Sequence, residues 1–157
     1  RDMALLKFEI PNNIALRPMV ISTKATGRGA RIAVFGYPLG THLGEALKLT
    51  TGIISSTAEQ TRNNMHLLDC RVNPGNSGGP LCDTAGNVIG MVTAKSGSGD
   101  GVDSYGMALP AADLDEFLKK HLPEYRTVPE TDVGSVSLEW DELDRLVSPS
   151  VLMIVSY

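Results

Sequence analysis

The sequence has no run of basic residues, no long apolar segment and only two cysteines among its 157 residues. Fourteen Lys and Arg against 18 Asp and Glu give a formal net charge of −4. Nucleic acid is therefore not an expected partner, because binding it needs a concentrated positive face. The longest wholly apolar run, Val151–Val155, is far shorter than the roughly 20 residues that span a bilayer. No membrane span is expected.

The two cysteines, Cys70 and Cys82, are too few for a disulfide framework. They could face each other across neighbouring strands, although buried thiols that act as small apolar residues are the more common case. Together with the three histidines they lack the spacing of a metal site. We predict no metal and no cofactor, and a disulfide between the two cysteines stays open.

The high content of glycine and proline predicts an all-β fold of short elements. Sixteen glycines and nine prolines stand beside only 5% aromatic residues, which favours many turns. Strand-like segments occur at 31–35, 47–55, 65–69, 80–82, 88–93 and 104–109. One confident helix is predicted over 111–122, where Leu114, Phe117 and Leu118 recur at helical spacing. The tail predicts a short helix at 139–147 and a strand at Val151–Val155.

The stretch from Gly75 to Leu81, Gly75-Asn76-Ser77-Gly78-Gly79-Pro80-Leu81, is the most informative one. A serine nucleophile needs an exposed hydroxyl on a tight turn and backbone N–H groups aimed at the developing oxyanion. Flanking glycines permit both. The same residues satisfy the nucleophile-elbow pattern of α/β-hydrolases, but that pattern requires a helix directly after the serine, and Pro80 leaves no room for one. We therefore place Ser77 in a loop between two strands.

This loop, read from Asn73, resembles the active-site loop of trypsin-fold serine peptidases, especially of the HtrA/Deg type. Four further segments agree in the same order: Asp2-Met3-Ala4-Leu5-Leu6-Lys7, Gly36-Tyr37-Pro38-Leu39-Gly40, Thr51-Gly52-Ile53-Ile54-Ser55, and 86–93 followed by 105–110. The resemblance implies a double β-barrel fold, of which this chain holds mainly the second six-stranded barrel. One strand of the first barrel and a C-terminal helix would complete it.

The resemblance also implies roles for individual residues. Ser77 would attack the scissile carbonyl, the N–H groups of Gly75 and Ser77 would form the oxyanion hole, and Asn76 would shape the turn. Asp2 would orient the catalytic histidine and stabilise it once protonated. The primary specificity pocket would be lined by Val72, Thr93, Ala94 and Lys95. Val72 favours a small or medium aliphatic substrate side chain, although Arg71 could reach the pocket floor.

The departure from the family is the histidine, which there precedes the aspartate by tens of residues. None of the three histidines of this sequence has that context. His42 falls in a variable loop, His66 is expected to be a packed or edge residue, and His121 suits the end of its helix through the dipole. Without a general base the serine hydroxyl is a poor nucleophile, so this chain alone is expected to be inactive or nearly so.

The opening residues Arg1-Asp2-Met3-Ala4 resemble neither a signal peptide nor a natural start, so we expect a piece of a longer protein. Residues 1–30 would end the first barrel and link it to the second, which spans 31–122. A linker follows at 123–135. The tail, 136–157, either packs a helix and a strand against the barrel or opens a further peptidase-like domain. The second alternative is raised because Ser148-Pro149-Ser150-Val151 resembles the segment that opens the first barrel in HtrA/Deg-like domains.

Two functions remain open: a serine endopeptidase of protein substrates, and a catalytically silent module of the same fold that binds peptides. A missing first barrel would expose apolar surface along Met3–Phe8, which tends to recruit partners. We therefore expect self-association or association with that first barrel. The resemblance implies export to the bacterial envelope, whereas the residues themselves indicate no compartment.

Overall fold

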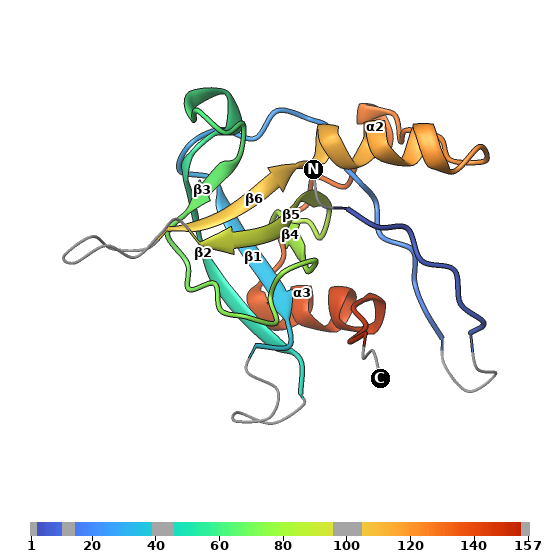
Figure 1. The fold of residues 1–157 in the computed structure, drawn as a ribbon. Coiled ribbons are helices and arrows are strands. Elements are labelled where there is room, and N and C mark those ends of the chain that lie inside the picture. Colours follow the sequence, from blue (N-terminus) through green and yellow to red (C-terminus); the bar gives the residue numbers. More distant parts are fainter. Residues whose placement is uncertain (1–2, 11–14, 39–45, 96–104, 155–157) are drawn as a thin grey trace.

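Six antiparallel strands close into a barrel in the computed structural model, which describes residues 3–10, 15–38, 46–95 and 105–154 (Figure 1). The strands are β1 (Arg31–Gly36), β2 (Lys48–Ser56), β3 (His66–Leu68), β4 (Pro80–Cys82), β5 (Val88–Lys95) and β6 (Gly106–Pro110). Their order around the barrel is β1-β2-β3-β6-β5-β4. The register pairs Ala33 with Thr51 on one side and with Cys82 on the other. The predicted all-β fold with a six-stranded barrel is confirmed.

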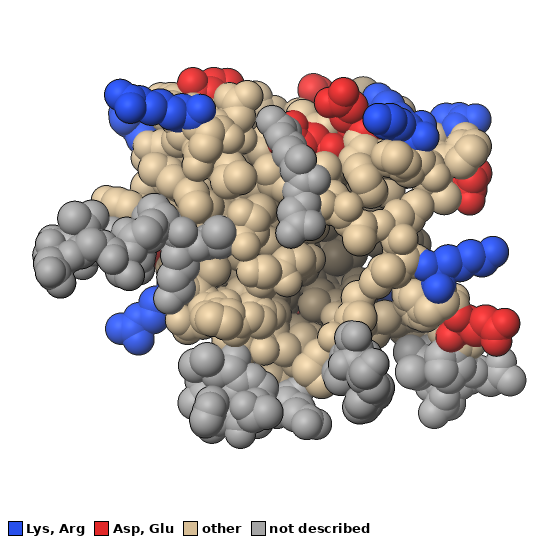
Figure 2. Space-filling view, viewed as in Figure 1, with Lys and Arg blue, Asp and Glu red and all other residues tan. Residues whose placement is uncertain are grey.

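Two α-helices accompany the barrel in the described residues. Helix α2 (Ala111–His121) follows β6 directly, and α3 (Trp140–Val147) lies near the C-terminus on the opposite side of the view in Figure 1. Three short 3-10 helices are η1 (Ala58–Gln60), η2 (Glu130–Asp132) and η3 (Ser148–Ser150). The face between α2 and α3 is hollowed, and the described charged side chains in this view lie toward its rim (Figure 2).

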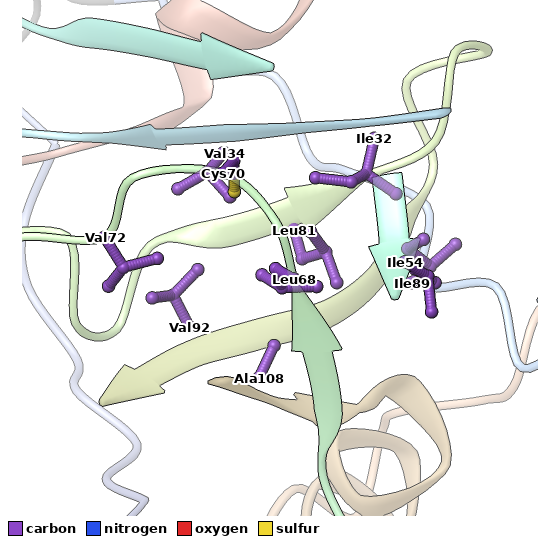
Figure 3. Close-up of a cluster of buried hydrophobic side chains, with 10 residues drawn as sticks. All are labelled: Ile32, Val34, Ile54, Leu68, Cys70, Val72, Leu81, Ile89, Val92 and Ala108. Carbon is purple, nitrogen blue, oxygen red and sulfur yellow. The ribbon is translucent and has the colours of Figure 1, made fainter. Parts of the chain in front are cut away.

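The barrel interior is filled by side chains from all six strands. In β1, Ile32 and Val34 point inward, because successive strand residues face opposite sides. Leu68 and Val92 meet them from β3 and β5 (Figure 3). The whole interior cluster comprises Ile32, Val34, Ile54, Leu68, Cys70, Val72, Leu81, Ile89, Val92 and Ala108. This packing fixes the positions from which the loop around Ser77 leaves and re-enters the barrel.

The outer face of β1 and β4 is covered by the C-terminal part of the chain. Phe35 and Cys82 point outward and pack in one cluster with Leu143 and Val147 of α3. The Arg31 guanidinium lies 4.6 Å from the centroid of the Trp140 ring, which adds a cation–π contact at the start of this helix. Residues 140–151 therefore belong to the same packed unit as the barrel.

Two expected strands, one of the first barrel within residues 1–30 and one at Val151–Val155, are absent from the described residues. The segment 3–10 forms no strand, and Leu6 and Phe8 are more than half exposed, because this part of the chain offers no neighbouring strand for pairing. The strand predicted at Val151–Val155 is wrong for Val151–Ile154, which follow η3 without strand pairing. The strands of the closed barrel pair with one another, and Val88 of β5 is also bridged by Ile21, so the apolar tail packs by its side chains instead.

Candidate active site

The loop around Ser77 is a series of tight turns between Asn73 and β4. The Asn76 N–H donates to the Asn73 carbonyl at 3.0 Å, and the Gly79 N–H donates to the Asn76 carbonyl at 3.0 Å. The loop is tied to β5 by the Gly78 N–H, which donates to the Val92 carbonyl at 2.8 Å. Ser77 therefore sits at the tip of a turn whose backbone is anchored on both sides.

Glycine is required at Gly75 for two separate reasons. Its φ angle is +97°, in the left-handed region that other residues adopt only with strain. A Cβ atom there would also collide with the carbonyl oxygen of Tyr37 and lie 3.0 Å from Cα of Pro38. Gly78 has a positive φ of +83° as well, but an added Cβ would meet nothing within 4 Å. The loop thus approaches the end of β1 closely at Gly75 and is open at Gly78.

The Ser77 side chain is exposed, and its hydroxyl donates to the backbone carbonyl of Thr93 at 2.9 Å. An amide carbonyl accepts a hydrogen bond but is far too weak a base to remove the hydroxyl proton. The hydroxyl is accordingly held in one direction and is not activated by this contact.

Two backbone N–H groups close to the Ser77 hydroxyl are available. Among the described residues, neither the Gly75 N–H nor the Ser77 N–H has a protein acceptor. The intervening Asn76 is buried, with 2% of its surface exposed, and its side-chain oxygen lies 2.7 Å from where a Cβ on Gly36 would be. Buried Asn76 therefore braces the turn against the end of β1, while its two neighbours keep their donors free.

A cavity of about 630 Å³ opens beside this loop in the hollowed face of Figure 2. Gly75, Ser77 and Tyr37 line one side of it, and Leu114 of α2 lines another. Residues 150–154 of the C-terminal tail complete the wall. The cavity is large enough for a short stretch of peptide, and its described lining residues are uncharged.

The described histidines lie away from Ser77 and do not line its cavity. His66 is 5% exposed, and its Nδ1 accepts a hydrogen bond from the Ala58 N–H at 3.2 Å. Burial lowers the pKa of His66 below its usual value, while the carboxylate of Glu59 partly opposes this shift. His66 is therefore the packed residue that we predicted. His121 stacks 4.6 Å from Phe117 at the end of α2, and His42 lies outside the described residues.

The predicted specificity residues lie in two different places, Val72 inside the barrel and the other three at the end of β5. Val72 is 3% exposed and packs in the barrel interior, where a Cβ on Gly106 would meet its side chain at 2.5 Å. Val72 does not line the cavity beside Ser77. Thr93, Ala94 and Lys95 end β5, and Thr93 contacts Ser77 through its carbonyl. Arg71 is exposed, and Asp2, the predicted triad acid, lies outside the described residues.

The two cysteines point to opposite sides of the barrel wall. Cys70 belongs to the interior cluster and Cys82 to the outer cluster under α3, so they form no disulfide. Burial raises the pKa of the Cys70 thiol to about 11, with a contribution from Asp69. Burial also raises the pKa of Cys82, and Asp83 adds to this. Neither thiol is a nucleophile near neutral pH, and Ser77 remains the candidate.

Tyr37 is a contact residue of the site that the sequence did not single out. Its N–H donates to the Gly75 carbonyl at 3.1 Å, and its hydroxyl donates to the Val151 carbonyl at 3.1 Å. The only signal in the sequence was its position inside the Gly36–Gly40 segment. That segment resembles a strand-ending turn and gives no indication of a contact with the tail.

Comparison with known proteins identifies relatives among the Do-like serine proteases. Residues 1–91 match the family model for the trypsin-like peptidase domain. The chain is 36% identical over 122 residues to the chloroplastic protease Do-like 1 of Arabidopsis thaliana, an alignment that covers 70% of this chain and 26% of that protein. It is 32% identical over 133 residues to the serine protease Do-like HtrA of Lactococcus lactis strain IL1403, covering 76% and 32%.

Solved structures agree with these relatives. An HtrA-type protease, AlgW, determined with a decapeptide, has a TM-score of 0.54 at 29% identity and covers 72% of this chain and 35% of that one. A serine endoprotease from Yersinia pestis has a TM-score of 0.54 at 29% identity, covering 68% and 36%. The chain thus spans about a fifth to a third of the length of its curated relatives, from 19% to 32%. No helix in the described parts of the chain is long and apolar enough to cross a membrane.

Proposed function

This chain belongs to the trypsin-like peptidase family, in its HtrA type, and we propose that it carries the nucleophile barrel of a serine endopeptidase that hydrolyses protein substrates. The observation that supports this most directly is the geometry of one loop. Ser77 is exposed between two glycines of positive φ, and the N–H groups of Gly75 and Ser77 on the same loop have no acceptor in the part of the chain that the structure describes. These are the requirements of a serine nucleophile with an adjacent oxyanion hole.

In the proposed reaction, Ser77 Oγ forms a bond to the carbonyl carbon of the scissile peptide. The hydroxyl proton passes to a histidine, and the carbonyl oxygen becomes an oxyanion held by the Gly75 and Ser77 N–H groups. When the C–N bond breaks, the histidine returns the proton to the leaving amine. Water then hydrolyses the acyl group from Ser77 by the same route, which restores the free hydroxyl.

The general base is proposed to come from a first barrel that is not among the described residues. The Thr93 carbonyl that now accepts the Ser77 hydrogen bond cannot take its proton, so the hydroxyl must turn toward a histidine for reaction. Asp2 is proposed to orient that histidine and to stabilise its protonated form. Asn76, buried under the loop, is proposed to keep the two oxyanion donors aligned.

Peptide is the proposed substrate class, which agrees with the decapeptide named for the similar AlgW structure. Thr93, Ala94 and Lys95 at the end of β5 are proposed to line the primary specificity pocket. Val72, 3% exposed in the barrel interior, is proposed to shape that pocket from inside the barrel and not to touch the substrate, so the pocket would favour a small or medium aliphatic side chain. The exposed apolar side chains of Leu5, Leu6, Phe8 and Ile10 are the proposed contact surface for a first barrel or for a second copy of the chain.

The second candidate function is a silent module that binds peptide in the same cleft. The contact between Ser77 and Thr93 favours the binding module, because a serine whose hydroxyl donates to a backbone carbonyl is not activated as a nucleophile. The two functions share the fold and the cavity and differ only in whether a base reaches Ser77.

A fluorophosphonate probe, which reacts only with activated serines, separates these functions. The probe would be applied to this chain and to a longer chain that includes a histidine-bearing barrel upstream, each with a Ser77→Ala counterpart. Labelling of the longer chain that disappears in Ser77→Ala is the expected result for the peptidase. An absence of labelling in both lengths would reject the peptidase and leave the binding module. Labelling of the short chain would place a base within it, and His42 would be the first residue to replace.

A further inference from the structure

Tyr37 connects two parts of the molecule that are far apart in the sequence. From one end of the residue, the backbone N–H donates to the Gly75 carbonyl at 3.1 Å. From the other end, the side-chain hydroxyl donates to the Val151 carbonyl at 3.1 Å, across 114 positions of the sequence. The same residue therefore touches the candidate oxyanion loop and the C-terminal tail.

The contact with Gly75 leaves little freedom on the loop side. The Tyr37 carbonyl oxygen occupies the place that a Gly75 Cβ would need, so the two backbones lie in direct contact. A displacement of Tyr37 consequently displaces Gly75, whose N–H is one of the two proposed oxyanion donors. Packed backbone contacts of this kind transmit small shifts because the neighbouring atoms have no empty space to move into.

The tail side of Tyr37 is held at several points. Leu143 and Val147 of α3 are completely or almost completely buried against the barrel, and the Tyr37 ring packs against the same cluster. Beyond α3, the Ser150 hydroxyl donates to the Arg17 carbonyl. Residues 150–154 then line the cavity that also contains Ser77 and Gly75. The tail is thus a docked wall of the candidate active site.

We propose that Tyr37 is a positioning residue that couples docking of residues 148–154 to the alignment of Gly75, so that the tail helps to hold the oxyanion loop in place. This inference rests on the proposed function, because it assigns a purpose to the Gly75 N–H. The inference gives a role to residues 148–154, to which the proposed function assigns none. Residues 148–154 act here through Tyr37 and not by contact with the reacting atoms.

Amide hydrogen exchange on the 157-residue chain tests the coupling without any need for catalysis. Tyr37→Phe keeps the ring and the backbone N–H and removes only the hydroxyl. Loss of one hydrogen bond is expected to speed exchange about 2- to 10-fold at the Val151 amide in the tail and at the residue 37 and Asn76 amides in the loop. Ser150→Ala, which releases the tail from Arg17 and leaves Tyr37 intact, is expected to speed exchange at the same loop amides.

The matched control is Tyr125→Phe, because the Tyr125 hydroxyl also donates one hydrogen bond, to Asp115 at 3.0 Å, and neither of these two residues lines the cavity. It is expected to leave the loop and tail amides unchanged. The Ile54 amide, bonded to the Ala30 carbonyl at 3.0 Å, serves as an internal reference for general loosening of the barrel, because Ile54 neither lines the cavity nor packs with Tyr37. Faster exchange in the tail with an unchanged loop would overturn the coupling, as would equal acceleration at Ile54.

The longer, histidine-bearing chain supplies a second readout. There, Tyr37→Phe is expected to lower the maximal rate of fluorophosphonate labelling by about 3- to 10-fold, because misaligned oxyanion donors stabilise the transition state less well. The probe concentration at half-maximal rate is expected to stay unchanged. A changed half-saturation with an unchanged maximal rate would contradict a positioning role. If the longer chain is not labelled at all, the proposed function fails, and the exchange experiment still decides the coupling.

Discussion

The hydroxyl of Ser77 donates to the backbone carbonyl of Thr93 over 2.9 Å, so the candidate nucleophile is bound to the end of strand β5. This contact shows how the barrel alone holds the serine: exposed, directed and without a base. A peptidase built on this barrel needs a histidine strong enough to draw the hydroxyl away from Thr93. Breaking the hydrogen bond to Thr93 costs little free energy, because a neutral hydrogen bond at an exposed position contributes little to stability.

Replacing Ser77 by alanine is accordingly expected to change the free energy of unfolding by less than about 1 kcal/mol, because the lost hydrogen bond is exposed. Ser22→Ala is the control: Ser22 is 2% exposed and its oxygen accepts from the Lys24 N–H, so its loss is expected to cost roughly 1–2 kcal/mol. Urea denaturation followed by circular dichroism measures both. A cost above about 2 kcal/mol for Ser77→Ala would show that the contact with Thr93 holds the whole loop together.

Three glycine-to-alanine variants separate backbone strain from steric contact. Gly27→Ala is expected to change stability by no more than about 0.5 kcal/mol, since Gly27 has neither a positive φ nor a neighbour within 4 Å. Gly78→Ala adds only the strain of a positive φ, about 1–2 kcal/mol. Gly75→Ala adds the collision with Tyr37 to that strain and is expected to cost roughly 2–5 kcal/mol. Unfolding midpoints in urea would rank the three, and equal costs at Gly75 and Gly78 would argue against the close approach to Tyr37.

His66 is expected to make stability depend on pH. Burial lowers its pKa in the folded state below the usual 6.5, so the unfolded chain binds a proton more readily than the folded chain. The contribution of His66 is therefore fully present above about pH 6.5 and is lost as the pH falls through the lower folded pKa.

His66→Asn keeps an acceptor for the Ala58 N–H and removes the titration, so it is expected to flatten the fall in urea midpoint between pH 7.5 and 5. His121→Asn makes the same replacement at the exposed end of α2 and is the control for the loss of an imidazole as such. An undiminished slope in His66→Asn would mean that other groups cause the pH dependence.

Two leucines of the same helix test whether α3 is part of the barrel unit. Leu143 is completely buried against the outer face of β1 and β4, whereas Leu146 is 38% exposed. Leu143→Ala is expected to cost about 2–4 kcal/mol through lost contacts and a cavity, and Leu146→Ala less than about 1.5 kcal/mol. Both would be read from a single unfolding transition of the 157-residue chain. A small cost at Leu143 would show that α3 does not pack on this barrel in solution.

Local pattern accounts for much of the agreement between expectation and fold. The strand predicted at 47–55 is β2 (Lys48–Ser56), and the helix predicted at 111–122 is α2 (Ala111–His121), because β-branched residues and a helical apolar face are properties of neighbouring residues. The loop around Ser77 was recognisable for a similar reason. Its glycines lie within five residues of one another, and the positive φ angles of Gly75 and Gly78 belong to the turn itself.

The sequence-based predictions were wrong or incomplete where segments that are distant in the sequence meet in the structure. The apolar run at Val151–Ile154 reads as a strand by composition, yet the barrel closes through β1 and β4 and the run packs by its side chains instead. Cys70 and Cys82 were open to pairing until the barrel wall separated them. Sequence spacing does not say which face of its strand points into the barrel, and only the packing of Leu81 inside and Cys82 under α3 decides it.

The amino-acid sequence by itself determined the class of fold, the family and the candidate nucleophile Ser77, because these depend on short runs of residues and their order. Only the tertiary structure decided that Tyr37 joins Gly75 to Val151, that the tail lines the cavity of Ser77, and that the Ser77 hydroxyl rests on Thr93. These contacts arise from barrel closure, which brings together residues that no local periodicity relates.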